Sequence, residues 1–204
     1  MILAAETNFI LELVLGQRES DACEKLVELS RNSIVLMLPA FSLVEAAMFI
    51  ERRRGERRNF IQRELQNQIQ DATGSGTLAR FASTLDQMNK ELRQAEDDES
   101  IRMLFFRSVQ CESLELIPVR APVLKRTDEY QLTDKIDRFP DALVFASVIT
   151  AMEGIPESSP ATPKYFVSGD KRFTRQWCLD ELRRVDCQLL SSFSAALAVA
   201  RKHL

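Results

Sequence analysis

Short apolar runs alternate along the chain with longer segments of helical periodicity, and this alternation limits the possible folds more than any other feature. Runs of this length, apolar almost throughout and ending abruptly at polar residues or proline, are typical of strands buried on both faces. Strands that alternate with helices predict an α/β fold, with a mostly parallel sheet of about four to five strands flanked by helices. The candidate strands lie at 1–5, 33–38, 114–119, 165–168 and 185–190.

The segment between the second and third candidate strands, at about 51–111, is long, charged and mostly helical in pattern. A turn is expected at 73–76, the acidic residues 96–99 are expected to form a solvated corner, and a further short helix is expected at 101–109. These features predict two to three helices that form a hairpin. We therefore expect a single domain over 1–204 that carries a helical insertion at about 51–111.

Composition excludes several classes of function. Hydrophobic residues make up 45% of the 204 residues, enough for a sizeable core, and the formal net charge of −3 argues against a protein that coats duplex nucleic acid. His203 is the only histidine, which disfavours Ser-His-Asp hydrolases, Cys-His proteases, HExxH metalloenzymes and histidine-based nucleases. The four cysteines form no CxxC pair and are expected to be free thiols. Catalysis would therefore depend on carboxylates, lysine or a cofactor.

The N-terminal residues have neither a basic flank nor a long apolar stretch, so no signal peptide is expected. No run approaches the ~20 apolar residues that a membrane span needs. We expect a soluble cytoplasmic protein that does not interact with membranes.

Four acidic residues lie where a parallel α/β sheet places its ligands, in the crevice at the carboxyl ends of the strands. Glu6 follows the first candidate strand, and Asp170 follows the fourth. Glu45 is expected in the first turn of the helix after the second strand, and Asp141 in the first turn of its own helix after Pro140. Residues far apart in the sequence would thus meet at one edge of the sheet.

Four carboxylates in one crevice repel one another and raise one another's pKa unless a positive charge neutralises them. A hard divalent cation with oxygen ligands does so, and Mg²⁺ or Mn²⁺ suits carboxylates and water. Two such ions are a common device for phosphodiester hydrolysis. The sequence therefore favours a divalent-metal site of a kind that phosphodiester hydrolysis uses.

Each acid also has a structural explanation. Glu45 ends a capping box that begins at Ser42, and Asp141 would complement the dipole of its helix. Asp170 could be a turn residue, and Glu6 an exposed residue after a strand. Taken singly these signals are weak, whereas their order and their placement after strands favour one site.

Each of the four acids lies in a segment that combines an apolar strand or helix with small polar residues. The segments are Ala5-Glu6-Thr7-Asn8-Phe9-Ile10, Leu38-Pro39-Ala40-Phe41-Ser42-Leu43-Val44-Glu45, Pro140-Asp141-Ala142-Leu143-Val144-Phe145-Ala146-Ser147, and Tyr165-Phe166-Val167-Ser168-Gly169-Asp170-Lys171-Arg172-Phe173. In this order they resemble the motifs of the PIN-domain family.

The resemblance implies a Mg²⁺- or Mn²⁺-dependent ribonuclease with RNA as substrate, in which these four acids are catalytic and face the metal. Thr7, Asn8 and Ser168 would support them by hydrogen bonding. Many PIN domains are toxins of bacterial type II toxin–antitoxin pairs, so the resemblance also suggests an antitoxin protein and a homodimer as partners. The family often carries a helical arm where the 51–111 insertion falls.

Glu6 stands where the family normally has aspartate. This departure leaves open an alternative, a PIN-fold module with weak or no catalysis that binds RNA or protein. A third class, the dehalogenase-like phosphatases, needs an Asp-x-Asp nucleophile after the first strand, which Glu6-Thr7-Asn8 does not supply.

Arginines cluster at the start of the insertion. They could contact RNA phosphates, since the guanidinium fork suits them, form a solvated face, or dock an acidic partner. The cluster contains Arg52, Arg53, Arg54, Arg57 and Arg58.

Overall fold

A five-stranded, all-parallel sheet forms the centre of the fold in a computed structural model that describes residues 1–74, 78–156 and 162–203. The strand order is β3-β2-β1-β4-β5, and every neighbouring pair is parallel. The predicted α/β fold with a parallel sheet flanked by helices is therefore confirmed. The strands are β1 (Ile2–Ala5), β2 (Val35–Pro39), β3 (Glu115–Ile117), β4 (Lys164–Val167) and β5 (Cys187–Leu190).

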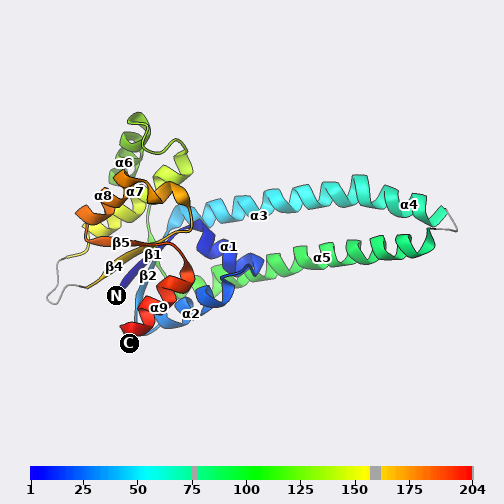
Figure 1. Ribbon diagram of the computed structural model, residues 1–204, viewed down its shortest axis with the longest axis horizontal. Coiled ribbons are helices and arrows are strands. Elements are labelled where there is room, and N and C mark those ends of the chain that lie inside the picture. Colours follow the sequence, from blue (N-terminus) through cyan, green and yellow to red (C-terminus); the bar gives the residue numbers. More distant parts are fainter. Residues whose placement is uncertain (75–77, 157–161, 204) are drawn as a thin grey trace. The chain divides into compact units, whose positions relative to one another are not determined.

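Helices cover both faces of this sheet (Figure 1). Helices α1, α2 and α9 pack together on one face, and α6, α7 and α8 lie on the other. Helix α8 is not apparent in the sequence, because only Cys178 and Leu182 of its side chains are buried. The bounds are α1 (Thr7–Leu15), α2 (Ser20–Ser30), α6 (Ala121–Leu132), α7 (Phe139–Glu153), α8 (Gln176–Arg184) and α9 (Phe193–Lys202).

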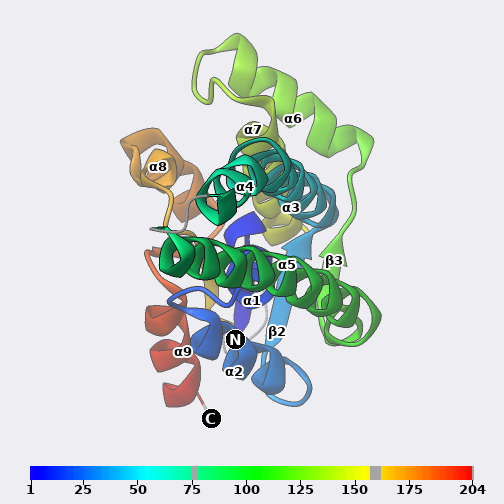
Figure 2. The same ribbon diagram turned by 90° about the vertical axis from the view of Figure 1, so that its right-hand side faces the viewer.

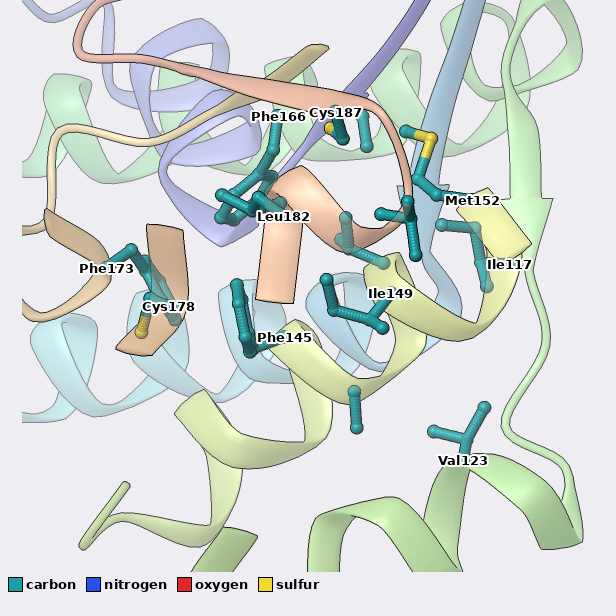
Figure 3. Packing of buried hydrophobic residues seen from close by; sticks show 14 of the residues in the cluster. Ile117, Val123, Phe145, Ile149, Met152, Phe166, Phe173, Cys178, Leu182 and Cys187 are labelled. Carbon is teal, nitrogen blue, oxygen red and sulfur yellow. The ribbon is translucent and has the colours of Figure 1, made fainter. Parts of the chain in front are cut away.

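A large hydrophobic cluster lies between the sheet and α7 (Figure 3). Side chains alternate along a strand, so Ile2 and Ala4 of β1 join this cluster. Phe173 stacks on Phe145 of α7 at 5.5 Å and meets Phe166 of β4 edge-on at 5.3 Å between ring centroids. These contacts anchor the short 3-10 turn that carries Phe173, Lys171–Thr174, directly after β4.

The chain divides into two compact units, residues 47–104 and the remainder, 1–46 with 105–204. The smaller unit overlaps most of the insertion expected at 51–111. It is an antiparallel helical hairpin in which two long helical segments lie side by side (Figures 1 and 2). Residues 75–76 of the turn expected at 73–76 lie outside the described residues. The helices are α3 (Ala40–Phe60), a π-helical turn (Ile61–Leu65), α4 (Gln66–Gly74) and α5 (Ala79–Ser108).

Helix α5 is continuous, so the predicted solvated corner at 96–99 and the separate helix at 101–109 are both wrong. Glu96 and Glu99 are each only 8% exposed. They lie between the two helical segments of the hairpin, where arginines of α3 neutralise their charges. Because these acids are paired, they can be buried without a break in α5.

None of the helices in the described part of the chain combines the length and the apolar character needed to cross a bilayer.

Candidate active site

The strand order creates a switch point beside β1. From β1 the chain moves to β2 and β3 on one side, while β4 and β5 lie on the other. In such sheets, ligands bind outside the carboxyl ends of the strands, at the point where the strand order reverses. Ala5, the last residue of β1, pairs with Val167, the last of β4. Glu6 and Ser168 therefore emerge next to each other at the switch point.

Glu6 is buried, with 6% of its surface exposed, so the interpretation as an exposed residue after a strand is wrong. It is the N-cap of α1, and its Oε2 accepts from the Asn8 backbone N at 3.0 Å. Its Oε1 accepts from Asn8 Nδ2 at 2.7 Å and from Ser168 Oγ at 3.1 Å. Burial raises the pKa of Glu6 to about 7, although these hydrogen bonds oppose the shift and Asp170 adds to it.

Asp170 is the N-cap of the 171–174 turn, with its Oδ1 accepting from the Arg172 backbone N at 2.8 Å. Its own backbone N donates to Ser168 Oγ at 3.0 Å, which joins Asp170 to the hydrogen bonds around Glu6. Burial raises the pKa of Asp170, but the hydrogen bonds and charge of Arg172 outweigh burial and hold this pKa below its ordinary value. Asp170 is thus a turn residue and a member of the site at once.

Asp141 lies in the first turn of α7, as predicted. Its Oδ2 pairs with Arg172 Nη1, and Arg138 Nε lies 3.9 Å away. Burial nevertheless raises the pKa of Asp141, and the charge of Asp170 adds to this effect against the attraction of the two arginines.

Glu45 lies in the second turn of α3 rather than the first, because α3 begins at Ala40 directly after β2. The predicted capping box is therefore wrong: Ser42 is inside the helix, fully buried, and its Oγ has no hydrogen-bond partner among the described residues. Glu45 is half-buried and accepts a hydrogen bond from Thr7 Oγ1. Since Thr7 follows Glu6 in the chain, this bond connects Glu45 to the switch point.

The four acids share one edge of the sheet but have different partners. Asp170 is close enough to raise the pKa of both Glu6 and Asp141, whereas Glu45 reaches the others only through Thr7. Within residues 1–74, 78–156 and 162–203, no three His, Cys, Asp or Glu side chains already lie together as a ligand group. These acids instead have other polar partners: Arg172 pairs with Asp141 and Asp170, while Asn8 and Ser168 donate hydrogen bonds to Glu6.

Arg172 is the residue that sequence reasoning missed. It lies inside the fourth PIN-like segment, two positions after Asp170, and a basic residue at that distance from a cap can turn back onto it. Its partner Asp141 is 31 positions away, and no sequence pattern indicates that contact.

The chemistry of the donors fits a hard divalent cation. All four acids, Thr7 and Ser168 offer oxygen, which Mg²⁺ and Mn²⁺ prefer. Glu6 in particular is a buried carboxylate that forms no ion pair within the described part of the chain. Such a group either keeps its proton or meets a positive charge.

The arginine cluster of the insertion is largely engaged within the hairpin. Arg58 Nε lies 2.6 Å from Glu96 Oε1, and Arg57 Nη2 lies 2.8 Å from Glu99 Oε1. Arg54 Nε also donates to Glu96 Oε1, at 3.3 Å. The acidic partner of these three arginines is therefore α5 of the same chain. Arg52 and Arg53 are exposed, and their contact with RNA stays a prediction.

Comparison of the chain with sequence models of protein families, with curated proteins and with solved structures found no significant match to any of them.

Proposed function

We propose that this protein is a divalent-metal-dependent endoribonuclease that hydrolyses RNA phosphodiester bonds. The observation that carries the proposal is that Asp170 is close enough to Glu6 and to Asp141 to raise the pKa of each, beside the switch point of a parallel sheet, with Glu45 linked through Thr7. Carboxylates beside the switch point suit metal-assisted phosphodiester chemistry. The four PIN-like segments supply the expectation that the substrate is RNA.

In this proposal Glu6, Glu45, Asp141 and Asp170 would hold Mg²⁺ or Mn²⁺, which would supply Lewis-acid chemistry for phosphodiester hydrolysis. The chain's other residues orient the ligands. Asn8 and Ser168 fix the carboxylate of Glu6 through three hydrogen bonds, and Thr7 fixes that of Glu45. Such supporting bonds keep ligands in a productive orientation.

A second candidate is a PIN-fold module that binds RNA or protein without cutting. Two observations favour it: Glu6 replaces the family's aspartate, and Arg172 occupies Asp141 and Asp170. An antitoxin partner and a homodimer stay predictions of the resemblance under either candidate.

The test is cleavage of end-labelled structured RNA, with single-stranded DNA for comparison, by protein stripped with chelator and then given Mn²⁺ or Mg²⁺. Asp141→Asn is expected to lower metal-dependent RNA cleavage at least about a hundredfold, the order that one charge-stabilising group contributes. Asp137→Asn is the matched control, because Asp137 is an exposed acid of the same region whose ion pair, with Arg175 at 3.7 Å, lies outside the site.

Equal cleavage by Asp141→Asn and wild type would contradict the proposed site. A wild-type protein that binds Mn²⁺ but cleaves no substrate would favour the binding module instead. Circular dichroism of Asp141→Asn separates loss of chemistry from loss of fold.

A further inference from the structure

Arg172 makes polar contacts with two of the predicted acids, Asp170 and Asp141. Its Nε donates to both carboxylate oxygens of Asp170, at 3.0 and 2.9 Å, and its Nη2 donates to Oδ2. Its Nη1 reaches across to Asp141. One guanidinium therefore bridges the two acids that come from the β4–α8 connection and from α7.

The bridge occupies the oxygens that a cation would need. A guanidinium bound to a carboxylate through its planar fork takes up the same lone pairs that a hard metal ion uses. It also contributes a full positive charge beside Asp141 and Asp170, which repels a second cation. A divalent ion would therefore compete with Arg172 for these carboxylates.

The backbone and the side chain of Arg172 are held in different ways. The backbone N is fixed by Asp170, and the next residue, Phe173, is 3% exposed in the hydrophobic cluster. The Arg172 side chain, by contrast, is 33% exposed. Its guanidinium can therefore turn toward solvent by rotation of side-chain bonds while the 171–174 turn stays in place.

We propose that Arg172 is an internal counter-cation that competes with the divalent ion for Asp141 and Asp170 and must leave both carboxylates when the ion binds. This inference rests on the cation site of the proposed function. The apparent affinity for the ion is then the intrinsic affinity reduced by the fraction of molecules in which Arg172 has moved away. Arg172 is a positioning residue that sets the ion concentration at which the site is filled.

The experiment measures Mn²⁺ binding by titration calorimetry on the full chain. Arg172→Gln is expected to bind Mn²⁺ about tenfold more tightly than wild type, because competition and charge repulsion are both removed. Lys171→Gln is the matched control, since it removes the same charge from the adjacent, exposed position of the same turn. It is expected to leave Mn²⁺ affinity nearly unchanged.

Thermal unfolding in chelator is a second measurement, in which Arg172→Gln should lower stability although it raises Mn²⁺ affinity. Without metal, Arg172→Gln is expected to unfold at a lower temperature than wild type, because Asp141 and Asp170 lose their partner. A residue with a purely structural role would weaken both stability and metal binding when replaced. Arg172→Lys keeps the charge without the fork and is expected to fall between wild type and Arg172→Gln in Mn²⁺ affinity.

Equal or weaker Mn²⁺ binding by Arg172→Gln would overturn this inference and leave the proposed nuclease untouched. Absence of Mn²⁺ binding in wild type and variants alike would overturn the inference together with the cation site. Tighter binding by Arg172→Gln with no RNA cleavage by any form would support the inference and contradict the nuclease.

Discussion

Glu6 shows how a single side chain can make a site depend on protonation. Its carboxylate is buried at the end of β1 and is held by neutral donors, Asn8 and Ser168. Neutral hydrogen bonds only partly replace the hydration that burial removes. In the metal-free protein Glu6 is therefore easier to protonate than an ordinary glutamate, and a bound cation would reverse this preference.

The pKa of Glu6 predicts how the stability of the metal-free protein changes with pH. Burial raises the folded-state pKa to about 7 from 4.5, so between these values the folded state holds a proton that the unfolded state has released. The free energy of unfolding of the metal-free protein should therefore fall as pH rises through this window, and Glu6 should contribute about 3 kcal/mol to the fall.

Chemical denaturation in chelator at pH 5 and pH 8 measures this effect. Glu6→Gln cannot ionise, so its stability should fall less than that of wild type between the two pH values. An identical fall in both proteins would show that Glu6 is not the group responsible.

At the residue scale, the sequence identifies Glu6, Asp141 and Asp170 because each follows a clear signal: the end of an apolar strand or the first turn of a helix. It does not identify Arg172 as a partner of Asp141, since that contact depends on how β4 and α7 pack. The predicted position of Glu45 in its helix is wrong because Ser42 resembles a helix cap, whereas α3 begins directly after Pro39.

At the scale of elements, the contacts between the two helical segments of the hairpin, residues 47–104, differ along its length. Near its tip Ile61, Leu65 and Leu85 form an apolar seam, with Ile69 and Leu92 packed against it. In the other half the seam consists of ion pairs between α3 arginines and Glu96 and Glu99. A run of acids looks solvated in the sequence, because the arginines that neutralise it lie about 40 residues earlier. Because of this separation, the sequence alone predicts two helices where the structure has the single helix α5.

The pair of Arg57 and Glu99 should stabilise the hairpin only as a pair. Their side chains are 10% and 11% exposed, so Arg57→Met leaves a buried, unpaired carboxylate, which costs about 3–5 kcal/mol. The double variant Arg57→Met/Glu99→Met should recover most of that loss, because it removes both charges.

Hydrogen exchange of the α3 and α5 amides measures the local opening free energy of the hairpin in each variant. Arg52→Met is the matched control, since Arg52 is exposed and its ion pair, with Glu56 at 3.8 Å, lies within the same helix. Additive effects of the two single changes in the double variant would contradict the account of a buried pair.

At the scale of the whole molecule, the alternation of strands and helices along the sequence is sufficient to predict a parallel sheet. Each of the five strands lies within three residues of its expected bounds, because short apolar runs with polar ends have few alternatives. The order β3-β2-β1-β4-β5 requires tertiary contacts, and that order creates the switch point. The candidate ligands all belong to the unit formed by 1–46 and 105–204.

Metal binding should therefore change hydrogen exchange rates only near the candidate ligands. Mn²⁺ is expected to slow hydrogen exchange at the carboxyl ends of β1 and β4 and at the start of α7, since a ligand that binds only the folded state suppresses opening there. Amides of α4 in the hairpin, which offers no candidate ligand, should exchange at an unchanged rate. Uniform protection along the chain would contradict a localised site.

The central claim is that carboxylates at the switch point bind a divalent cation that displaces Arg172. Anomalous diffraction at the manganese edge, from crystals grown with Mn²⁺, tests it most directly. We expect a peak beside the carboxylates of Asp141 and Asp170, with the Arg172 guanidinium turned away from both. Well-ordered crystals with no manganese there, and with Arg172 still bridging the two acids, would contradict the account.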